Sequence, residues 1–228
     1  MTQRAALAPE SLTDPAVAST RRAALWSLRL GALSVALHVV RLINLPSART
    51  ALRDAAARQV VIESPAVTID DLMLSLSGIA FLAAGIFGCI WLVRAYREGR
   101  ASDATLKPVS DNWLWVMWLV PVVMWIAPVL RVRGLLRAAN VSGPRGWLVY
   151  LWAAVWMPVD FFQRSYRAPL LESDDRATAL WTVGFGVAFA LWAALVTTID
   201  RALDRQRAAP ALGQPVSSSV GGGASGQS

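Results

Sequence analysis

The charged residues of this chain are gathered into short clusters, and long runs without any charge lie between them. Residues 72–93 and 177–199 carry no acidic or basic side chain over 22 and 23 positions. Because an α-helix rises about 1.5 Å per residue, each run is roughly 33 to 35 Å long as a helix, enough to cross the hydrocarbon core of a bilayer. The pattern therefore predicts an all-α integral membrane protein.

The composition agrees with a chain that lies mostly in lipid. Hydrophobic residues make up 55% of the 228 residues and charged residues only 16%, whereas soluble domains carry about 25% charged residues. Cys89 is the single cysteine, which excludes a disulfide scaffold. With one histidine and one cysteine, the chain cannot build a His/Cys metal cluster or a two-histidine haem site. We therefore expect neither a metal nor a cofactor.

The first apolar run, residues 23–45, is interrupted by Arg29, His38 and Arg41. The two arginines lie 12 positions apart, which is about 18 Å along a helix. If each side chain extends roughly 6 Å toward its own membrane surface, the two charges lie about 30 Å apart, which matches the hydrocarbon core. This run is therefore predicted to span as well.

Two further apolar runs are shorter and contain proline. Residues 147–162 include Pro158 and Asp160 near their end, and residues 113–130 include Pro121 and Pro128. Runs of this length measure only about 24 to 27 Å as helices, so either one crosses a bilayer only if it is almost untilted.

The distribution of arginine and lysine favours four spans over five. The favoured topology has spans at 23–45, 72–93, 147–162 and 177–199, with 113–130 as a proline-broken segment that enters the membrane and returns to the same side. It places 14 basic residues on the inner side and seven on the outer side, whereas five spans would place 10 inside and 11 outside. Because cytoplasmic loops are enriched in Lys and Arg, we predict four spans with both termini in the cytoplasm. Five spans remain the alternative.

The two ends of the chain differ from this membrane domain, which covers residues 21–207. Residues 1–20 contain proline, serine and threonine without apolar periodicity, and residues 208–228 are rich in glycine and serine. Both segments are predicted to be disordered tails.

The net charge of +7 raises the question of nucleic acid, but the arginines flank apolar runs instead of sharing a face with aromatic residues. This position is typical of residues that contact lipid headgroups, so we expect no nucleic-acid partner. Residues 131–139 alternate arginines with apolar residues and predict an interfacial basic helix. The candidate contacts to anionic headgroups are Arg94, Arg97, Arg131, Arg133 and Arg137.

Two patterns along the predicted helices are candidate functional features. Trp118, Pro121, Trp125 and Pro128 are spaced by 3, 4 and 3 residues and share one helical face. We interpret this face as a kinked helix packed by bulky rings; a hinge or gate is the alternative, since proline frees a backbone carbonyl.

The second pattern is a polar and small-residue stripe along the first span. It is formed by Ser27, Gly31, Ser34, His38 and Arg41, at spacings of 4, 3, 4 and 3. Ionisable residues inside a membrane are candidates for function, so an ion or proton path with Asp70 or Asp71 nearby is one interpretation. No acidic residue lies deep in any span, and helix packing is the favoured interpretation.

Residues for catalysis are few. No serine or cysteine lies in a sequence motif with the single histidine, and the pairs Asp70-Asp71 and 174–175 are typical of helix caps and solvated loops. We therefore predict no catalytic residues and a chain that is not an enzyme.

A family resemblance is carried by the middle of the chain. A basic patch closes the second span (LVRAYREG), a tryptophan-rich W-x2-P-x3-W-x2-P segment follows (WLVPVVMWIAPVL), and then a basic stretch (RVRGLLRAAN). Over roughly residues 72–199 this arrangement resembles bacterial membrane proteins of the domain-of-unknown-function 4328 family. The resemblance implies a multi-pass membrane topology and no established activity.

These observations lead to one functional hypothesis and one alternative. The hypothesis is a non-enzymatic membrane protein that scaffolds or modulates other membrane components, with the lipid bilayer, anionic headgroups and either a membrane protein or a second copy as partners. The alternative is a small-molecule or ion conduit that uses the polar stripe and the proline-broken helix. A membrane-embedded enzyme is a more distant third.

Overall fold

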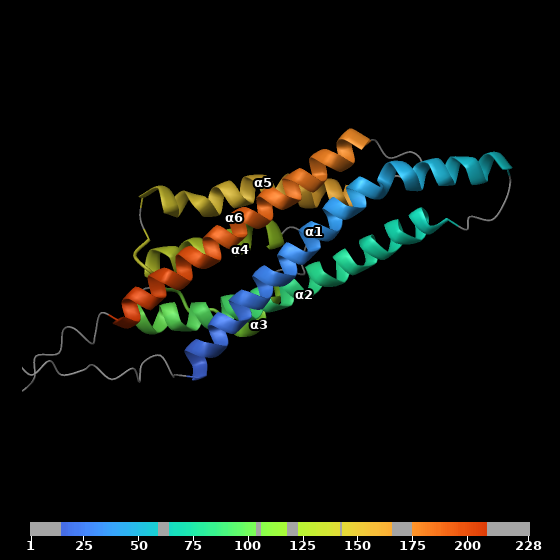
Figure 1. Ribbon diagram of the computed structural model, residues 1–228. Helices are drawn as coiled ribbons and strands as arrows, with labels where there is room; N and C mark the ends of the chain where they lie inside the picture. Colours follow the sequence, from blue (N-terminus) through green and yellow to red (C-terminus); the bar gives the residue numbers. More distant parts are fainter. Residues whose placement is uncertain are drawn as a thin grey trace, which may run out of the picture.

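The computed structural model describes residues 15–58, 64–103, 106–117, 123–141, 143–165 and 175–208. Within these ranges the chain is helical and contains no strand, which confirms the predicted all-α class. The elements are α1 (Pro15–Arg58), α2 (Pro65–Ser102), α3 (Asp111–Val116), α4 (Val123–Ala138), the 3-10 helix η2 (Gly143–Trp147), α5 (Leu148–Ser165) and α6 (Asp175–Ala208) (Figure 1).

Three helices, α1, α2 and α6, are long and apolar enough to cross a membrane. They contain the runs 23–45, 72–93 and 177–199 that the sequence predicts as spans. α1 has 44 residues, about 66 Å of helix, so it extends well beyond a hydrocarbon core of about 30 Å. α5 has 18 residues and contains Pro158; its crossing as a fourth span stays a prediction.

The helices form two antiparallel pairs that pack together. α1 packs along α2, α5 packs along α6, and α1 also contacts α6. α1 begins, α2 ends, α5 begins and α6 ends at the same end of the bundle (Figure 1). This arrangement brings the chain back to one end after α1 and α2 and again after α5 and α6.

The predicted boundary of the N-terminal tail at residue 20 is too far along the chain. α1 already starts at Pro15, a residue favoured in the first turn of a helix. The hydroxyls of Ser19 and Thr20 donate to the Ala16 carbonyl at 2.7 and 3.1 Å, and Arg94 of α2 donates to the Ser19 carbonyl at 2.8 Å. These bonds hold residues 15–20 in the helix. The rest of both predicted tails, apart from Ala208 at the end of α6, lies outside the described residues.

The predicted proline-broken segment, residues 113–130, covers most of α3 and the first half of α4, and both helices contact α2. Residues 118–122, which include Trp118 and Pro121 of the predicted motif, lie outside the described residues. The predicted interfacial helix 131–139 is the continuation of α4, which runs through Pro128 to Ala138. Its apolar residues Val132 and Leu135 are fully buried against protein, so this arc does not face lipid.

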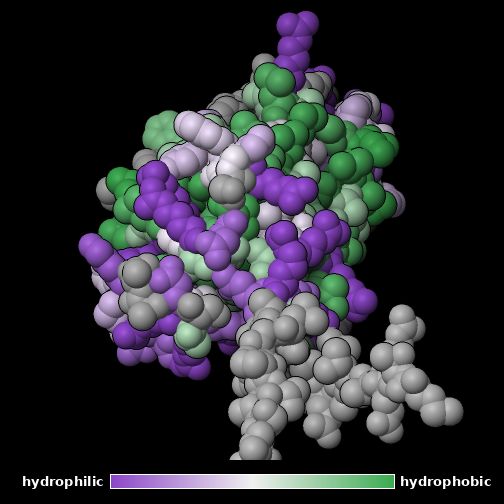
Figure 2. Space-filling model, turned by 90° about the vertical axis from the view of Figure 1, so that its left-hand side faces the viewer, coloured by the Kyte–Doolittle hydropathy of each residue, from purple (hydrophilic) through white to green (hydrophobic). Residues whose placement is uncertain are grey.

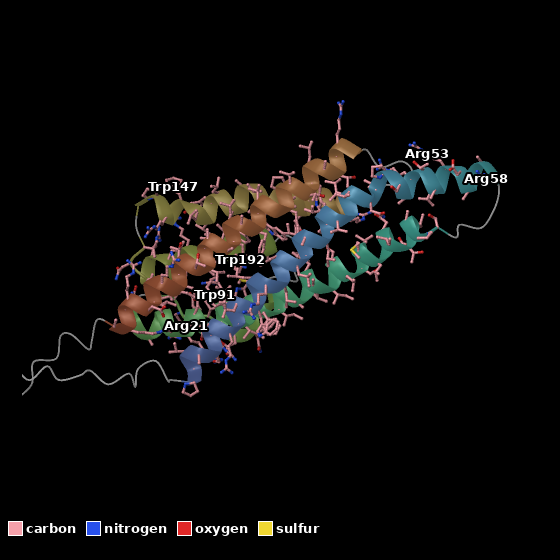
Figure 3. The ribbon with its side chains drawn as sticks, in the orientation of Figure 1. Arg21, Arg53, Arg58, Trp91, Trp147 and Trp192 are labelled. Carbon is pink, nitrogen blue, oxygen red and sulfur yellow. The ribbon has the colours of Figure 1, made fainter. Side chains whose placement is uncertain are left out.

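The surface divides into a charged end and apolar sides. Figure 2 looks onto the end where α1 begins and α6 ends, and hydrophilic residues gather there. On the sides, large apolar residues are exposed, such as Ile43 at 74%, Ile79 at 66% and Leu180 at 74%. Arg21 lies near the charged end, whereas Arg53 and Arg58 lie at the far end of α1 (Figure 3). Exposed apolar sides between charged ends are typical of a helix bundle in a bilayer.

Candidate functional site

The polar stripe of α1 faces α2 and is hydrogen-bonded to it. Ser27 Oγ donates to the Ala84 carbonyl at 3.0 Å, and Ser34 Oγ donates to the Ser77 carbonyl at 3.1 Å. Each of these serines is a small residue at which two helices approach closely, and an interhelical hydrogen bond satisfies its hydroxyl. We call this contact the polar seam; its members are Ser27, Ser34, His38 and Arg41 of α1 with Asp70 and Ser77 of α2.

His38 lies at the centre of the polar seam. Its Nε2 is 2.7 Å from Ser77 Oγ, which is 3.2 Å from Ser34 Oγ. Trp181 and Phe185 of α6 also contact the imidazole ring in T-shaped arrangements, with ring centroids 4.6 and 5.2 Å away. A hydroxyl bonded to an imidazole is the arrangement of a nucleophile and its base. Here, however, both serines are 0% exposed, and none of the three side chains lines the cavity described below.

Arg41 and Asp70 form the ion pair at one end of the polar seam. Arg41 Nε donates to Asp70 Oδ1 at 3.1 Å and to Oδ2 at 3.2 Å. The Asp70 side chain is 3% exposed and that of Arg41 18%, whereas Asp71 is exposed. Of the two acidic residues that the sequence offers, only Asp70 therefore belongs to the seam.

Arg29 and Gly31 occupy different faces of α1. Arg29 is exposed, and its guanidinium lies 5.8 Å from the ring centroid of Trp26, three residues closer to the charged end. This is the direction that the predicted extension of Arg29 toward its own surface requires. Gly31 is buried against the ring of Phe189 on α6, so this member of the predicted stripe lies at the contact between α1 and α6 and is not part of the polar seam.

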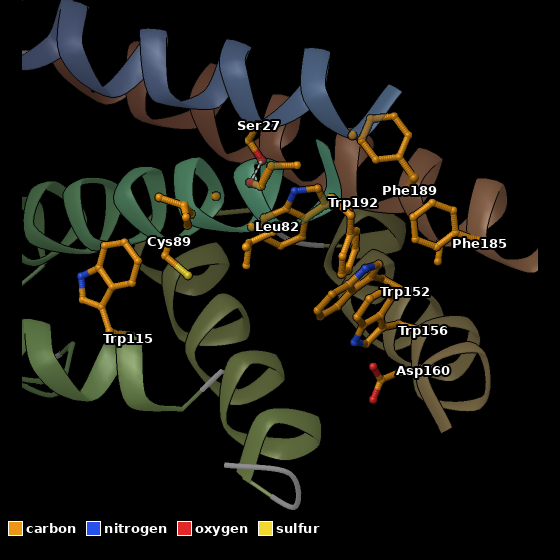
Figure 4. Close-up of a pocket in the computed structure, with 17 residues that line it drawn as sticks. Ser27, Leu82, Cys89, Trp115, Trp152, Trp156, Asp160, Phe185, Phe189 and Trp192 are labelled. Atoms are coloured by element: carbon orange, nitrogen blue, oxygen red, sulfur yellow. Dashed lines mark hydrogen bonds between the residues drawn. The ribbon is translucent and has the colours of Figure 1, made fainter. Parts of the chain in front are cut away.

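A cavity of about 400 Å3 lies among α2, α5 and α6, with Ser27 and Gly31 of α1 and Trp115 of α3 at its wall (Figure 4). Aromatic rings dominate it: Trp152 stacks on Trp156 with centroids 6.3 Å apart, and Trp152 lies 5.3 Å from Trp192. Asp160 is 5% exposed and is the one charged residue among the described residues that line the cavity. The Nε1 of Trp156 is buried without a hydrogen-bond partner.

A network of ionic contacts closes the charged end. Arg21 of α1 pairs with Asp204 of α6 at 2.8 Å, and Arg207 of α6 bridges Asp204 and Glu98 of α2. Just beyond the apolar run 177–199, Asp200 accepts a hydrogen bond from Trp91 Nε1 at 2.8 Å.

Burial raises the pKa of the Asp200 carboxyl to about 6. The hydrogen bond from Trp91 and the charges of Arg207 and Arg21 oppose this increase, and the charge of Asp204 adds to it. The carboxyl therefore titrates closer to neutral pH than an ordinary aspartate.

Three of the five arginines that are predicted to contact lipid headgroups interact with other groups of the protein. Arg94 bonds to the Ser19 carbonyl, Arg97 pairs with Asp111, and Arg133 lies 5.3 Å from the ring centroid of Tyr150. Arg131 is half-buried and Arg137 is exposed; headgroup binding by all five stays a prediction. In the tryptophan-proline motif, Trp125 and Pro128 lie in α4, and Pro128 is buried.

Apart from Ser27 and Gly31, the residues that line the cavity were not predicted from the sequence. Trp152, Trp156 and Asp160 recur every four residues and therefore share one face of α5. On α6, Phe185, Phe189 and Trp192 follow a similar period. This spacing indicates one aromatic face on α5 and one on α6, but it does not show that the two faces meet in the folded protein. No group of three His, Cys, Asp or Glu side chains that could hold a metal occurs in the part of the chain that the structure describes.

The comparison with known proteins agrees with the resemblance found in the sequence. No curated protein and no solved structure is significantly similar to this chain. The family described as "Domain of unknown function (DUF4328)" matches residues 54–201, which include α2 to α5 and most of α6. Because this match covers more than half of the chain and contains the motif that carries the resemblance, the protein belongs to the DUF4328 family.

Proposed function

We propose that this protein is a non-enzymatic membrane protein that scaffolds or modulates other membrane components. It sits in a bacterial cell membrane with the charged end and both termini in the cytoplasm. The observation that carries the proposal is the polar seam, because the polar groups of the first span are used for contacts between helices.

The contacts in the polar seam support a structural role for its residues, as opposed to a role in an ion or small-molecule path. A conduit needs polar groups that face a continuous wet passage. Ser34, Ser77 and His38 instead bond to one another while almost fully buried, and Arg41 is paired with Asp70. These contacts support a role in holding α1 and α2 together as a rigid pair of helices.

The geometry also supports a role without catalysis. The Ser77–His38 contact is buried between three helices, where a substrate has no access. Cys89 lies 12 positions after Ser77 on α2, about 18 Å along the helix axis, so it does not join this contact.

The surface proposed to meet a partner is the charged end. Arg137 and Arg201 are exposed there, and the Gln206 amide of α6 donates to the Ala138 carbonyl of α4 at 2.7 Å, which fixes the two helix ends together. A fixed, strongly charged surface next to the membrane fits the polar rim of a partner protein.

Photocrosslinking in intact cells tests the proposal. A photoreactive residue at Arg137 or Arg201 should yield a discrete protein adduct, and the same residue at the lipid-facing Ile79 should not. Two differently tagged copies of the chain distinguish a second copy from another membrane protein. If both charged-end positions yield no protein adduct, the scaffold proposal is wrong. If reconstituted protein carries ions or small molecules across a vesicle membrane, the conduit replaces it.

A further inference from the structure

The cavity among α2, α5 and α6 opens sideways, through the apolar surface of α2. Its floor is buried and includes Trp152 of α5 and Phe185 of α6, whereas Leu82 and Ile86 of α2 line it and are exposed (Figure 4). The exposed residue Ile79 precedes these two on the same face of α2, because residues 79, 82 and 86 are spaced by 3 and 4. The cavity is therefore continuous with the exposed apolar side of the bundle.

The cavity lies at the depth of the hydrocarbon core. Its lining residues on α2 fall within positions 81–89, and those on α6 within positions 185–192. Both stretches lie inside the charge-free runs 72–93 and 177–199. In a bilayer the solvent at this depth is hydrocarbon. Side chains that face a void there lose dispersion contacts on one side, so an apolar occupant is favoured over an empty space.

The polar groups at the wall are already used within the protein. The Ser27 hydroxyl donates to the Ala84 carbonyl at 3.0 Å, and Asp160 interacts with another group of the protein. The Nε1 of Trp156 has no partner, but protein atoms cover it, so an occupant of the cavity does not reach it. What remains for recognition is a wall of aromatic rings and aliphatic side chains, which suits an uncharged, apolar occupant.

We propose that this cavity holds an acyl chain of a membrane phospholipid, which enters from the bilayer past Leu82 and Ile86. The proposal rests on the membrane location in the proposed function and is independent of the scaffold role. Acyl chains are the most concentrated apolar groups beside the opening, so mass action favours them over rarer apolar molecules.

The size of the cavity disfavours a helix from a second copy as its occupant. A helix with its side chains is about 10 Å across and rises about 5.4 Å per turn, so one turn occupies roughly 400 Å3. The cavity has a volume of about 400 Å3 in total. A helix could therefore place no more than about one turn in it, whereas a slender chain can lie along its wall.

Photolabelling from the lipid side tests the proposal. The purified full-length protein is reconstituted in phosphatidylcholine vesicles that contain a trace of phosphatidylcholine with a diazirine midway along one acyl chain. After irradiation, peptide mass spectrometry locates the adducts. We expect adducts at the buried floor residues Trp152 and Phe185 and at Val183, an exposed residue of α6 outside the cavity.

The positions of the adducts distinguish the possible failures. Labelling of Val183 without labelling of the floor would overturn the proposal alone and favour closure of the cavity by a second copy. Absence of labelling at all three positions would contradict the membrane location as well.

A cavity-filling variant with a matched control confirms the location of the chain. Gly85 and Gly78 are both exposed on α2, and a Cβ built at either position meets nothing within 4 Å, but of these two only Gly85 lines the cavity. Both Gly85→Leu and Gly78→Leu should fold, since leucine is a better helix former than glycine. Gly85→Leu should lose the floor adducts and keep the adduct at Val183, and Gly78→Leu should keep both. Unchanged floor labelling in Gly85→Leu would overturn the proposal.

Discussion

The ion pair between Arg41 and Asp70 gives the sharpest test of the polar seam, because the neighbouring Asp71 is a matched control. Asp70→Asn keeps the size of the side chain and removes its charge, so Arg41 is left without its partner. Asp71→Asn makes the same chemical change one position further along α2, at an exposed residue. A difference between the two variants therefore reports the environment of Asp70 and not the loss of an acid from the helix.

The structure sets the size of the expected effect. Arg41 Nε lies 3.1 and 3.2 Å from the two carboxylate oxygens, which corresponds to about 5 kcal/mol of attraction at an effective dielectric constant near 20. The Arg41 side chain is 18% exposed, so water partly solvates its charge when the partner is lost. We expect Asp70→Asn to lower the free energy of unfolding by about 2 to 4 kcal/mol, and Asp71→Asn by less than about 0.5 kcal/mol.

The assay is unfolding by sodium dodecyl sulfate in mixed micelles, followed by circular dichroism. The double variant Arg41→Gln/Asp70→Asn removes both charges and should recover part of the loss, because no buried charge is left unpaired. If Asp70→Asn and Asp71→Asn destabilise the protein equally, Asp70 is not buried against Arg41 and the seam is wrong at this end.

Three further predictions concern other parts of the bundle. A Cβ at Gly31 would lie 2.2 Å from a ring atom of Phe189 on α6, whereas a Cβ at Gly78 meets nothing within 4 Å. Gly31→Ala should therefore be less stable than Gly78→Ala by about 1 to 3 kcal/mol in the same assay. Equal stability of the two variants would contradict the packing of α1 on α6. The pKa of Asp200 is raised from 3.8 to about 6 in the folded protein. Between these pH values the folded chain therefore binds more protons than the unfolded chain. We expect the free energy of unfolding to fall by at most about 3 kcal/mol as the pH rises through this window. Asp200→Asn keeps an acceptor for Trp91 and should remove this slope; an unchanged slope would assign it to another group. A reporter fused after α6 should read cytoplasmic, and a periplasmic signal would favour five spans.

The long charge-free runs were enough to predict the helical class, because a run of about 20 apolar residues has few other stable structures. The ends of the helices were less predictable. Nothing in the composition of residues 15–20 shows that Arg94, far away in the sequence, bonds to the Ser19 carbonyl and extends α1. Similarly, Pro46 did not end α1, which continues to Arg58.

In the candidate sites too, local features could be predicted from the sequence, whereas contacts between distant segments could not. The spacing of the polar stripe places Ser34, His38 and Arg41 on one side of α1, because helical period is a local property. Their partners Ser77 and Asp70 depend on how α2 lies against α1, and His38 and Ser77 are 39 positions apart in the sequence. The cavity required a third and a fourth helix, so no local pattern could reveal it.

The central claim is that Ser34, His38 and Ser77 of the polar seam are closed between helices, and cysteine accessibility tests it most directly. Replacing Cys89, the single cysteine, by alanine gives a cysteine-free background in which Ser34→Cys, Ser77→Cys and the exposed Arg53→Cys are each tested with a charged, membrane-impermeant thiol reagent. We predict that Arg53→Cys reacts in the native membrane, while Ser34→Cys and Ser77→Cys react only after denaturation. Rapid labelling at positions 34 and 77 in the folded protein would show a water-filled path along α1 and contradict the account.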